Sequence, residues 1–213
     1  MTGQSFETMR RAMVASQLRT NAVNDPRVVA AMAAVPREEF VPADKAAIAY
    51  TDIAVPLGGG RALNPPMVLG RLLTELHPQP GERALVIGAA TGYAAAVLAR
   101  LAGRVVALEE DASLSMPATA AAGVAVVVGP LVQGWEAAAP YDLILIDGAV
   151  EAVPPAIIDQ LVEGGRLATA IVEDGVTRLA VGRRAGHGFG LAAFADADAV
   201  RLPGFAAPPA FKF

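Results

Sequence analysis

The sequence contains no cysteine and only two histidines, and both shortages exclude kinds of site. Without cysteine there is no disulfide framework and no thiol nucleophile. A zinc site based on histidine would have only His77 and His187 available, so we expect no structural metal. The chain also lacks the G-x-x-x-x-G-K-[ST] pattern of a P-loop and the G-x-S-x-G pattern of an esterase nucleophile elbow.

Charge is scarce as well. Only 18% of the 213 residues are charged, and the formal net charge is −4 at pH 7. Proteins that bind a phosphate backbone carry clustered lysine and arginine, and this chain has no such run, so we expect no nucleic acid as a main partner. The hydrophobic share of 54% instead predicts one well-packed globular domain spanning residues 1–213.

No segment has the pattern of a leader or a membrane span. The first 20 residues include Glu7 and three arginines and have no continuous apolar core, which predicts a cytoplasmic protein without a secretory signal. The longest uncharged stretch, residues 112–135, contains Pro117 and Pro130, which would break a spanning helix. For this stretch we predict a helix near 111–121, a turn and a buried strand, with no membrane association.

Residues 1–78 have the pattern of a helical, loop-rich cap. Apolar residues recur at helical spacing over 5–20, Asp25-Pro26 is a typical start for a helix over 26–34, and Pro65-Pro66 starts a helix that runs to about Leu76. The prolines and glycines of residues 36–60 predict an irregular region between these helices.

From Arg83 onward, short aliphatic runs alternate with alanine-rich helical stretches. Continuous apolar strands separated by helices predict a mostly parallel sheet covered on both faces, which is an α/β fold. Two later strands lack intervening helices and are expected to add antiparallel edges. We therefore divide the chain into the cap, an α/β core over 79–172 and C-terminal strands over 173–213. The predicted strands are 84–87, 104–108, 124–128, 141–147, 166–172, 177–183 and 190–195.

The segment most informative about chemistry is the turn after the first core strand, Gly88-Ala-Ala-Thr-Gly92. Glycine at such a turn allows close approach of a ligand to the backbone, and an acid about 20 positions later accepts hydrogen bonds from ribose hydroxyls. Glu109 closes the next strand and stands where that acid is expected. This spacing alone fits a dehydrogenase, a methyltransferase or an α/β domain without a nucleotide.

Seven blocks of the chain resemble, in order, the protein-L-isoaspartate O-methyltransferase family. The resemblance covers nearly the whole chain, and its first block is the most specific. The blocks are Val35-Pro-Arg-Glu-Glu-Phe-Val-Pro42, Ala49-Tyr-Thr-Asp52, Leu57-Gly-Gly-Gly60, Val86-Ile-Gly-Ala-Ala-Thr-Gly-Tyr93 with Ala96-Val-Leu-Ala99, Pro140-Tyr-Asp142, Gln160-Leu-Val-Glu-Gly-Gly165 and Ala197-Asp-Ala-Val-Arg201.

The resemblance implies a Rossmann-like class I S-adenosylmethionine-dependent methyltransferase fold and a cytoplasmic protein-repair activity. The implied reaction transfers methyl from S-adenosylmethionine to the carboxylate of isoaspartyl residues in damaged proteins or peptides, and leaves S-adenosylhomocysteine. A monomer or a homodimer is expected. The implied cofactor-binding residues are Gly88, Ala90, Gly92 and Glu109, and the implied substrate-binding residues are Gly60, Leu63 and Asn64, with Asn64 as the catalytic residue.

The sequence departs from the family pattern at five positions. Val86 stands where the family usually has Glu, Ala90 replaces the middle glycine of the turn, and Asn64 replaces a serine that positions the substrate carboxylate. Pro130 stands where the family has an acid for the adenine amino group. Asp147 is an added charge, and we hypothesise that it meets a cationic part of the cofactor. The alternative interpretation is an N-cap or turn carboxylate for the following segment.

Three alternatives remain open from the sequence. The departures from the pattern fit a family member that has lost catalysis and acts as a binding or scaffold protein. A methyltransferase with another acceptor, including a metal-dependent one, is the second alternative, because the strand ending in Asp147 vaguely resembles a strand with a metal-binding Asp. A dehydrogenase is the third, although no catalytic residue for it is evident.

Overall fold

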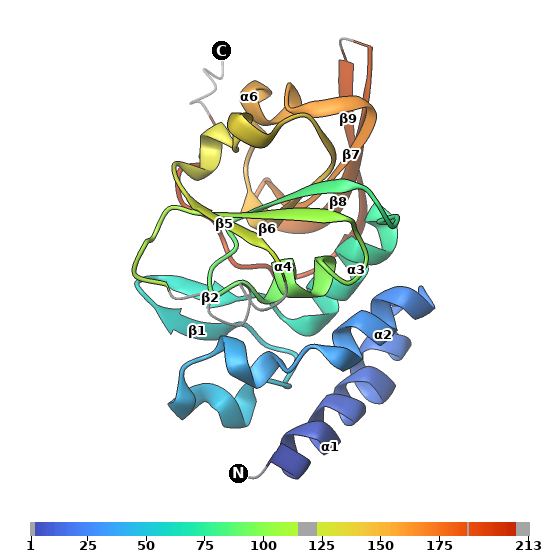
Figure 1. Cartoon of the computed structure of the whole chain (residues 1–213), viewed down its shortest axis with the longest axis vertical. Helices are drawn as coiled ribbons and strands as arrows, with labels where there is room; N and C mark the ends of the chain where they lie inside the picture. Colours follow the sequence, from blue (N-terminus) through green and yellow to red (C-terminus); the bar gives the residue numbers. More distant parts are fainter. Residues whose placement is uncertain (1–2, 115–122, 187, 208–213) are drawn as a thin grey trace.

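A computed structural model describes residues 3–114, 123–186 and 188–207 of the chain (Figure 1). Its centre is a seven-stranded sheet with the order β5-β4-β3-β6-β7-β8-β9. The five strands from β5 to β7 are parallel to one another, and β8 and β9 are antiparallel additions at one edge. The strands are β3 (Arg83–Ile87), β4 (Arg104–Glu109), β5 (Ala125–Val128), β6 (Tyr141–Val150), β7 (Leu161–Glu173), β8 (Val176–Ala185) and β9 (Gly188–Asp196).

This topology confirms the predicted fold class. The chain continues from β3 to β4 on one side of β3, whereas β6 pairs with the other side of β3. Strand order therefore reverses at β3, and in open α/β sheets the ligand crevice lies outside the carboxyl ends of the strands at such a point. The predicted turn Gly88–Gly92 follows β3 at this edge.

The helices largely follow the predicted ranges. Asp25 caps α2 by accepting a hydrogen bond from the Arg27 amide, as the Asp-Pro start predicts. The predicted helix over 5–20 begins at Gly3 and changes after Met13 into a π-helical segment and then a 3₁₀ turn. The α-helices are α1 (Gly3–Met13), α2 (Pro26–Ala34), α3 (Pro66–Leu76), α4 (Tyr93–Leu98) and α6 (Pro155–Ile158).

The region predicted to be irregular contains more structure than the sequence indicated. Arg37–Phe40 and Ala43–Ile48 form 3₁₀ helices, and β1 (Val55–Gly58) pairs with β2 (Arg61–Leu63) in an antiparallel hairpin. The hairpin is a separate two-stranded sheet and is not hydrogen-bonded into the central one. Its tip consists of Gly58, Gly59 and Gly60, all at positive φ, a conformation that glycine adopts without strain.

One prediction about strand burial was wrong. The strand predicted to be buried within residues 112–135 is β5, and it lies at the edge of the sheet with Val126 42% and Val128 55% exposed. An apolar run does not distinguish a central strand from an edge strand, because that depends on which strands pair. Most of the helix predicted near 111–121 lies outside the described residues, which here reach a turn at Asp111–Leu114.

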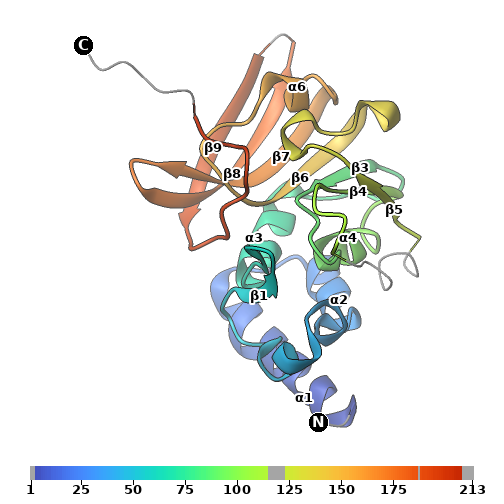
Figure 2. The same ribbon diagram turned by 90° about the vertical axis from the view of Figure 1, so that its left-hand side faces the viewer.

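Alternate side chains of each central strand point to opposite faces, and each face has its own core. Val86 and Leu145 pack with the N-terminal helices, whereas Ile87 and Ile146 pack with the segment around α6. Figure 2 shows α1, α2 and α3 on one side of the sheet and α6 on the other. None of the helices in the described part of the chain is long and apolar enough to span a membrane.

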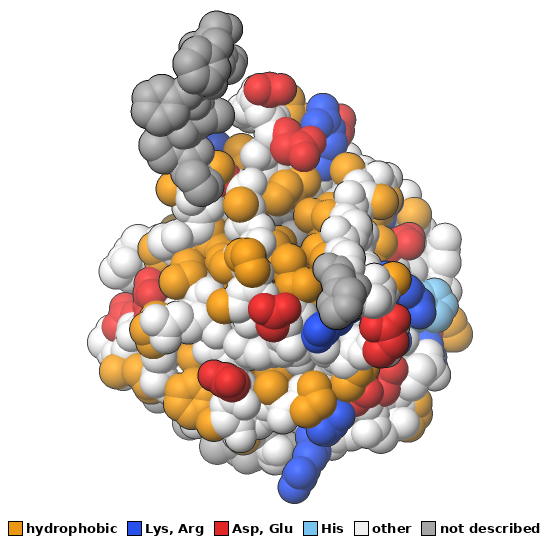
Figure 3. Space-filling model, turned by 90° about the horizontal axis from the view of Figure 1, so that it is seen from above, with side chains coloured by type: hydrophobic (Ala, Val, Ile, Leu, Met, Phe, Trp, Pro, Cys, Tyr) orange, Lys and Arg blue, Asp and Glu red, His pale blue; other side chains and the backbone are white. Residues whose placement is uncertain are grey.

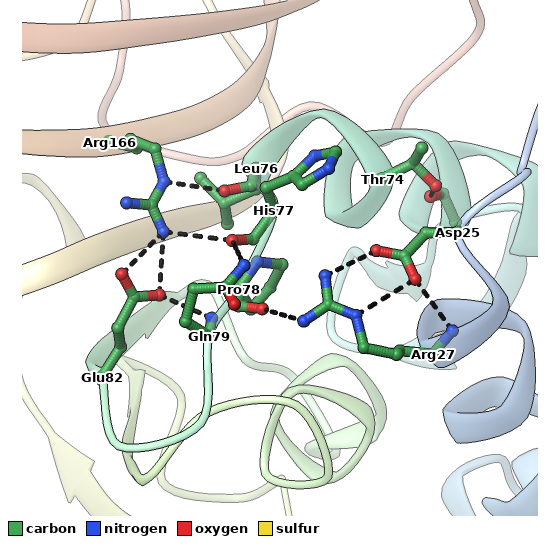
Figure 4. A network of polar contacts seen from close by, with 10 residues as sticks. Asp25, Arg27, Thr74, Leu76, His77, Pro78, Gln79, Glu82 and Arg166 are labelled. Carbon is green, nitrogen blue, oxygen red and sulfur yellow. Dashed lines mark hydrogen bonds and ion pairs between the residues drawn. The ribbon is translucent and has the colours of Figure 1, made fainter.

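A polar network attaches the N-terminal helices to the amino end of the sheet (Figure 4). Arg166 on β7 donates to the Leu76 carbonyl at 2.8 Å, at the end of α3, and to both carboxylate oxygens of Glu82 at 2.8 and 2.9 Å. Arg27 of α2 donates to the Pro78 carbonyl at 3.0 Å. The bond from Arg166 to Leu76 crosses the predicted boundary at residue 78, and β7 continues through the predicted boundary at residue 172. The division into cap, core and C-terminal strands stays a prediction.

Candidate active site

Buried polar side chains gather at the carboxyl edge of the sheet. Seven polar or charged residues are buried in the described part of the chain, and five of these lie close together. Hydrogen bonds join Arg37, Asn64 and Asp147, an ion pair joins Arg61 to Glu109, and the charges of this ion pair act on Asp147. Glu109 and Asp147 come from β4 and β6, whereas the other three come from segments N-terminal to the core. We call this group the edge cluster; its members are Arg37, Arg61, Asn64, Glu109 and Asp147.

The turn after β3 has the backbone conformation that its spacing suggests. Gly88, Ala90 and Gly92 all have positive φ, at 74°, 50° and 94°. The left-handed conformation costs an alanine about 1–2 kcal/mol, so Ala90 keeps the geometry of a glycine turn at the expense of strain. The amides of Gly88 and Ala89 both donate to the Leu108 carbonyl at 3.0 Å, which holds the turn against the end of β4.

Glu109 is fully buried and its carboxylate has hydrogen-bond donors on both oxygens. Oε1 accepts from the amides of Glu110 at 3.0 Å and Asp111 at 3.2 Å. Oε2 accepts from the Ala90 amide at 2.7 Å and from Arg61 Nη2 at 2.7 Å. The acid predicted to meet ribose hydroxyls therefore lies at the predicted turn, with an arginine bound to it.

Arg61 extends from β2 into the edge cluster and is 8% exposed. Only its Nη2 is bonded, while Nε and Nη1 are buried without a hydrogen-bond partner among the described residues. Leu202 and Arg61 both lie against Gly88, because a Cβ built on Gly88 would be 2.8 Å from Leu202 Cδ2 and 3.5 Å from Arg61 Nη2. Arg61 and Leu202 thus cover the face of the glycine turn.

Asn64 joins three segments of the chain at this edge. Its Nδ2 donates to the Asp147 carboxylate at 2.9 Å and to the Asp147 carbonyl at 3.1 Å, and its Oδ1 accepts from the Val200 amide at 2.7 Å. The Val200 carbonyl in turn accepts from the Ala149 amide at 2.7 Å. The predicted catalytic residue therefore lies at the carboxyl edge of the sheet with both side-chain polar atoms in use, and its catalytic role stays a prediction.

Arg37 supports the edge cluster from the 3₁₀ helix. Its Nε donates to the Ala49 carbonyl at 2.7 Å and its Nη2 to the Asn64 carbonyl at 2.6 Å, and its guanidinium lies 4.6 Å from the centre of the Tyr93 ring. Burial lowers the pKa of Arg37, while the nearby Tyr93 and Asp147 oppose that shift. Neither Arg37 nor Arg61 was singled out from the sequence. A signal existed for Arg61, because it stands two residues before the apolar Leu63, and residues two apart on a strand share a face.

Asp147 does not act as a helix cap, because it lies within β6 with its carboxylate bonded to Asn64. Burial raises the pKa of Asp147 above its ordinary value, and the Asn64 hydrogen bond and the charges of Arg37 and Arg61 oppose the shift. Between the unfolded and the folded pKa, the native state binds more protons than the unfolded state, so this group lowers stability as the pH rises.

We therefore expect Asp147→Asn to gain stability relative to the wild type as the pH rises from about 4 to about 7. Asparagine does not titrate, and its side-chain oxygen still accepts from Asn64. Urea unfolding at several pH values measures the difference. The exposed Asp44 provides a control, Asp44→Asn, and parallel stability curves for Asp147→Asn and the wild type would refute the expectation.

The remaining predicted site residues, Gly60 and Leu63, and the departures Val86 and Pro130 lie in different surroundings. Gly60 is exposed at the tip of the hairpin, whereas the side chain of Leu63 is 2% exposed and belongs to the core. Val86 is fully buried on the helical side of the sheet, and Pro130 precedes the 3₁₀ turn Leu131–Gln133. A role of Leu63 in substrate binding would have to come from its backbone; these assignments stay predictions.

A hollow of about 830 Å³ lies elsewhere, on the α6 face, where apolar side chains gather (Figure 3). Trp135 and Gln160 line it, and the Gln160 amide is bonded to the backbone of Gln133, Trp135 and Ala156. The hollow contains no member of the edge cluster and no charged side chain besides Glu136 and Asp159. No group of three or more His, Asp or Glu that could hold a metal occurs among the described residues.

Comparisons with known proteins agree with the resemblance. A family model described as protein-L-isoaspartate(D-aspartate) O-methyltransferase matches residues 9–191. The protein-L-isoaspartate O-methyltransferase of Methylorubrum populi is 43% identical over 166 residues, which cover 76% of this chain and 78% of that protein. The protein of the same name from Methanoregula boonei is 39% identical over 168 residues, covering 76% of this chain and 77% of the relative.

Solved structures agree on the fold. One described as a protein-L-isoaspartate O-methyltransferase has a TM-score of 0.77 at 23% identity, covering 93% of this chain and 66% of its own. A second is a putative protein-L-isoaspartate O-methyltransferase from Plasmodium falciparum in complex with S-adenosyl-L-homocysteine. It has a TM-score of 0.73 at 19% identity and covers 92% of this chain and 97% of its own. At these identities the likeness establishes the shared architecture.

Proposed function

Because the chain belongs to the protein-L-isoaspartate(D-aspartate) O-methyltransferase family, we propose that it methylates the α-carboxylate of isoaspartyl residues in damaged proteins, with S-adenosylmethionine as the methyl donor. Family membership carries the choice of reaction and acceptor, and the pairing of a glycine-type turn after β3 with the buried Glu109 at the end of β4 supports the cofactor site. We place this repair activity in the cytoplasm, with a monomer or a homodimer as the working form and isoaspartyl proteins or peptides as partners.

The residues of the edge cluster fit the chemistry of this cofactor. A buried carboxylate accepts hydrogen bonds from ribose hydroxyls, and backbone at positive φ lets a ligand approach closely. Glu109 would hold the ribose, and the turn Gly88–Gly92 would face the amino-acid end of the cofactor. When bound, S-adenosylmethionine supplies an activated methyl group on a sulfonium, which is a good leaving group.

The acceptor needs no general base. A carboxylate with a pKa near 4 is ionised at neutral pH, so the nucleophile is already formed. The residues therefore have to bind the carboxylate close to the methyl group and exclude water, which is the proximity contribution to catalysis. Asn64 and the Val200 amide would position the acceptor after exchanging their present hydrogen-bond partners for its carboxylate. The positive charges of Arg37 and Arg61 offset the negative charges of Asp147 and Glu109 in the edge cluster.

The proposal predicts methyl transfer to an isoaspartyl peptide and no transfer to the matched peptide with a normal aspartyl residue. The two peptides have the same composition and differ only in which carboxylate carries the backbone, so they separate substrate recognition from general reactivity. Labelled S-adenosylmethionine and base-labile peptide methyl ester measure the product. Equal labelling of both peptides, or of neither, would count against the proposal.

A binding role without catalysis is the second candidate. The observation that favours it is the occupation of Glu109 by Arg61, together with the replacement of the family's serine by Asn64. Binding of S-adenosylhomocysteine without transfer to the isoaspartyl peptide would support this candidate, or a different methyl acceptor.

A further inference from the structure

The hydrogen-bonding capacity of the Glu109 carboxylate is in use throughout. Three backbone amides and Arg61 Nη2 donate to its two oxygens, at distances between 2.7 and 3.2 Å. A ribose hydroxyl must reach one of these oxygens to be held by Glu109. The amides belong to the turn and to the chain directly after β4, so Arg61 is the donor that can leave without unfolding the edge of the sheet.

Arg61 is poorly satisfied where it lies. Its Nε and Nη1 are buried without a partner among the described residues, so the ion pair with Glu109 satisfies only one of its three nitrogens. Buried donors that lack acceptors oppose the stability of an ion pair. The contact between Arg61 and Glu109 is therefore one that a competing ligand can break.

The segment that carries Arg61 is held at one end by the buried Leu63 and Asn64, so the tip of the hairpin is the part that can shift. β2 pairs only with β1, and the hairpin is not part of the ladder of the central sheet. The tip of the hairpin lies over the stretch after β4, because a Cβ on Gly59 would be 3.1 Å from an Asp111 carboxylate oxygen. Movement of the hairpin would expose Glu109 and leave the hydrogen bonds between the central strands intact.

We propose that Arg61 is a built-in competitor for the ribose site, which occupies Glu109 in the free protein and has to leave before the cofactor binds. This inference rests on the proposed function, because it takes S-adenosylmethionine as the ligand of Glu109. Arg61 thereby limits cofactor affinity, and cofactor binding is coupled to displacement of the Arg61 side chain and the tip of the hairpin β1–β2.

Calorimetric titration of the full chain with two ligands tests this role. S-adenosylhomocysteine has a ribose and an amino-acid carboxylate, whereas 5′-methylthioadenosine has the ribose without that carboxylate. Arg61→Ala is expected to tighten the binding of both ligands by the same factor, at least tenfold. Arg61→Lys keeps the positive charge and should bind less tightly than Arg61→Ala. The control is Arg83→Ala. Arg83 begins β3 at the amino ends of the strands, opposite the carboxyl edge, so this substitution should leave both affinities unchanged.

The other outcomes separate this inference from the proposed function. If Arg61→Ala lowers the affinity for S-adenosylhomocysteine and leaves the affinity for 5′-methylthioadenosine unchanged, Arg61 is a ligand of the amino-acid carboxylate. The competitor role is then wrong, while the proposed function stands. Unchanged affinity for both ligands also overturns the competitor role alone. If neither the wild type nor Arg61→Ala binds either ligand, the inference and the proposed function both fail.

Discussion

Replacement of Glu109 by glutamine is expected to reduce the affinity for S-adenosylhomocysteine about a hundredfold, because hydrogen bonds to a charged group contribute about 1.5–3 kcal/mol each. In Glu109→Gln, an N–H₂ group also replaces one carboxylate oxygen. Both of these oxygens accept from N–H groups in the free protein. Glutamine would point an N–H at one of these pairs of donors. Calorimetry with S-adenosylhomocysteine measures the loss.

Glu110→Gln is the matched control for this change. Glu110 is the next residue, and its side chain is exposed. The Glu110→Gln substitution removes the same charge from the same segment. We expect its affinity to stay close to that of the wild type. If Glu109→Gln binds within a factor of about three of the wild type, Glu109 does not hold the ribose and the assignment of the cofactor site to this edge is wrong. The urea midpoint of Glu109→Gln should be measured alongside, because Arg61 loses its charged partner in this variant.

Replacement of Arg37 by methionine is expected to lower the free energy of unfolding by about 3 kcal/mol, the range for breaking a buried set of charged hydrogen bonds. Methionine retains the apolar stem but leaves the carbonyls of Ala49 and Asn64 without their donor. It also removes the cation beside the Tyr93 ring and one of the charges that face Asp147. Urea denaturation measures the change.

The same substitution at Arg11 provides the comparison. The side chain of Arg11 is 77% exposed and forms an ion pair with Glu7 one helical turn away, and surface pairs of this kind contribute little to stability. Arg11→Met should therefore unfold at nearly the same urea concentration as the wild type. Equal midpoints for Arg37→Met and Arg11→Met would show that the buried arginine does not stabilise the fold.

The sequence predicted the features that depend on local pattern. The helix over 26–34 begins at its Asp-Pro start because capping involves neighbouring residues, and the strands from Arg83 onward are recognisable because buried parallel strands are continuously apolar. Glu109 lies beside the turn after β3 because β4 is paired with β3, so the strand ends meet at one edge. These features require no knowledge of distant contacts.

The features that were missed or wrong depend on distant contacts. β5 is exposed because it is the last strand of the sheet, a fact that its own four residues do not encode. From the sequence alone, Arg37 and Arg61 resemble ordinary surface charges. Their burial depends on carbonyl and carboxylate partners 12 to 48 positions away. Asn64 could be aligned with a substrate-binding serine, but its hydrogen bonds to Asp147 and Val200 appear only when the chain is folded.

The most direct test of the cofactor site is titration of the unmodified chain with S-adenosylhomocysteine. We predict saturable binding with one site per chain, which is competed by S-adenosylmethionine and lost in Glu109→Gln. The absence of binding at millimolar ligand would contradict the central claim that the edge formed by Gly88–Gly92 and Glu109 binds this cofactor.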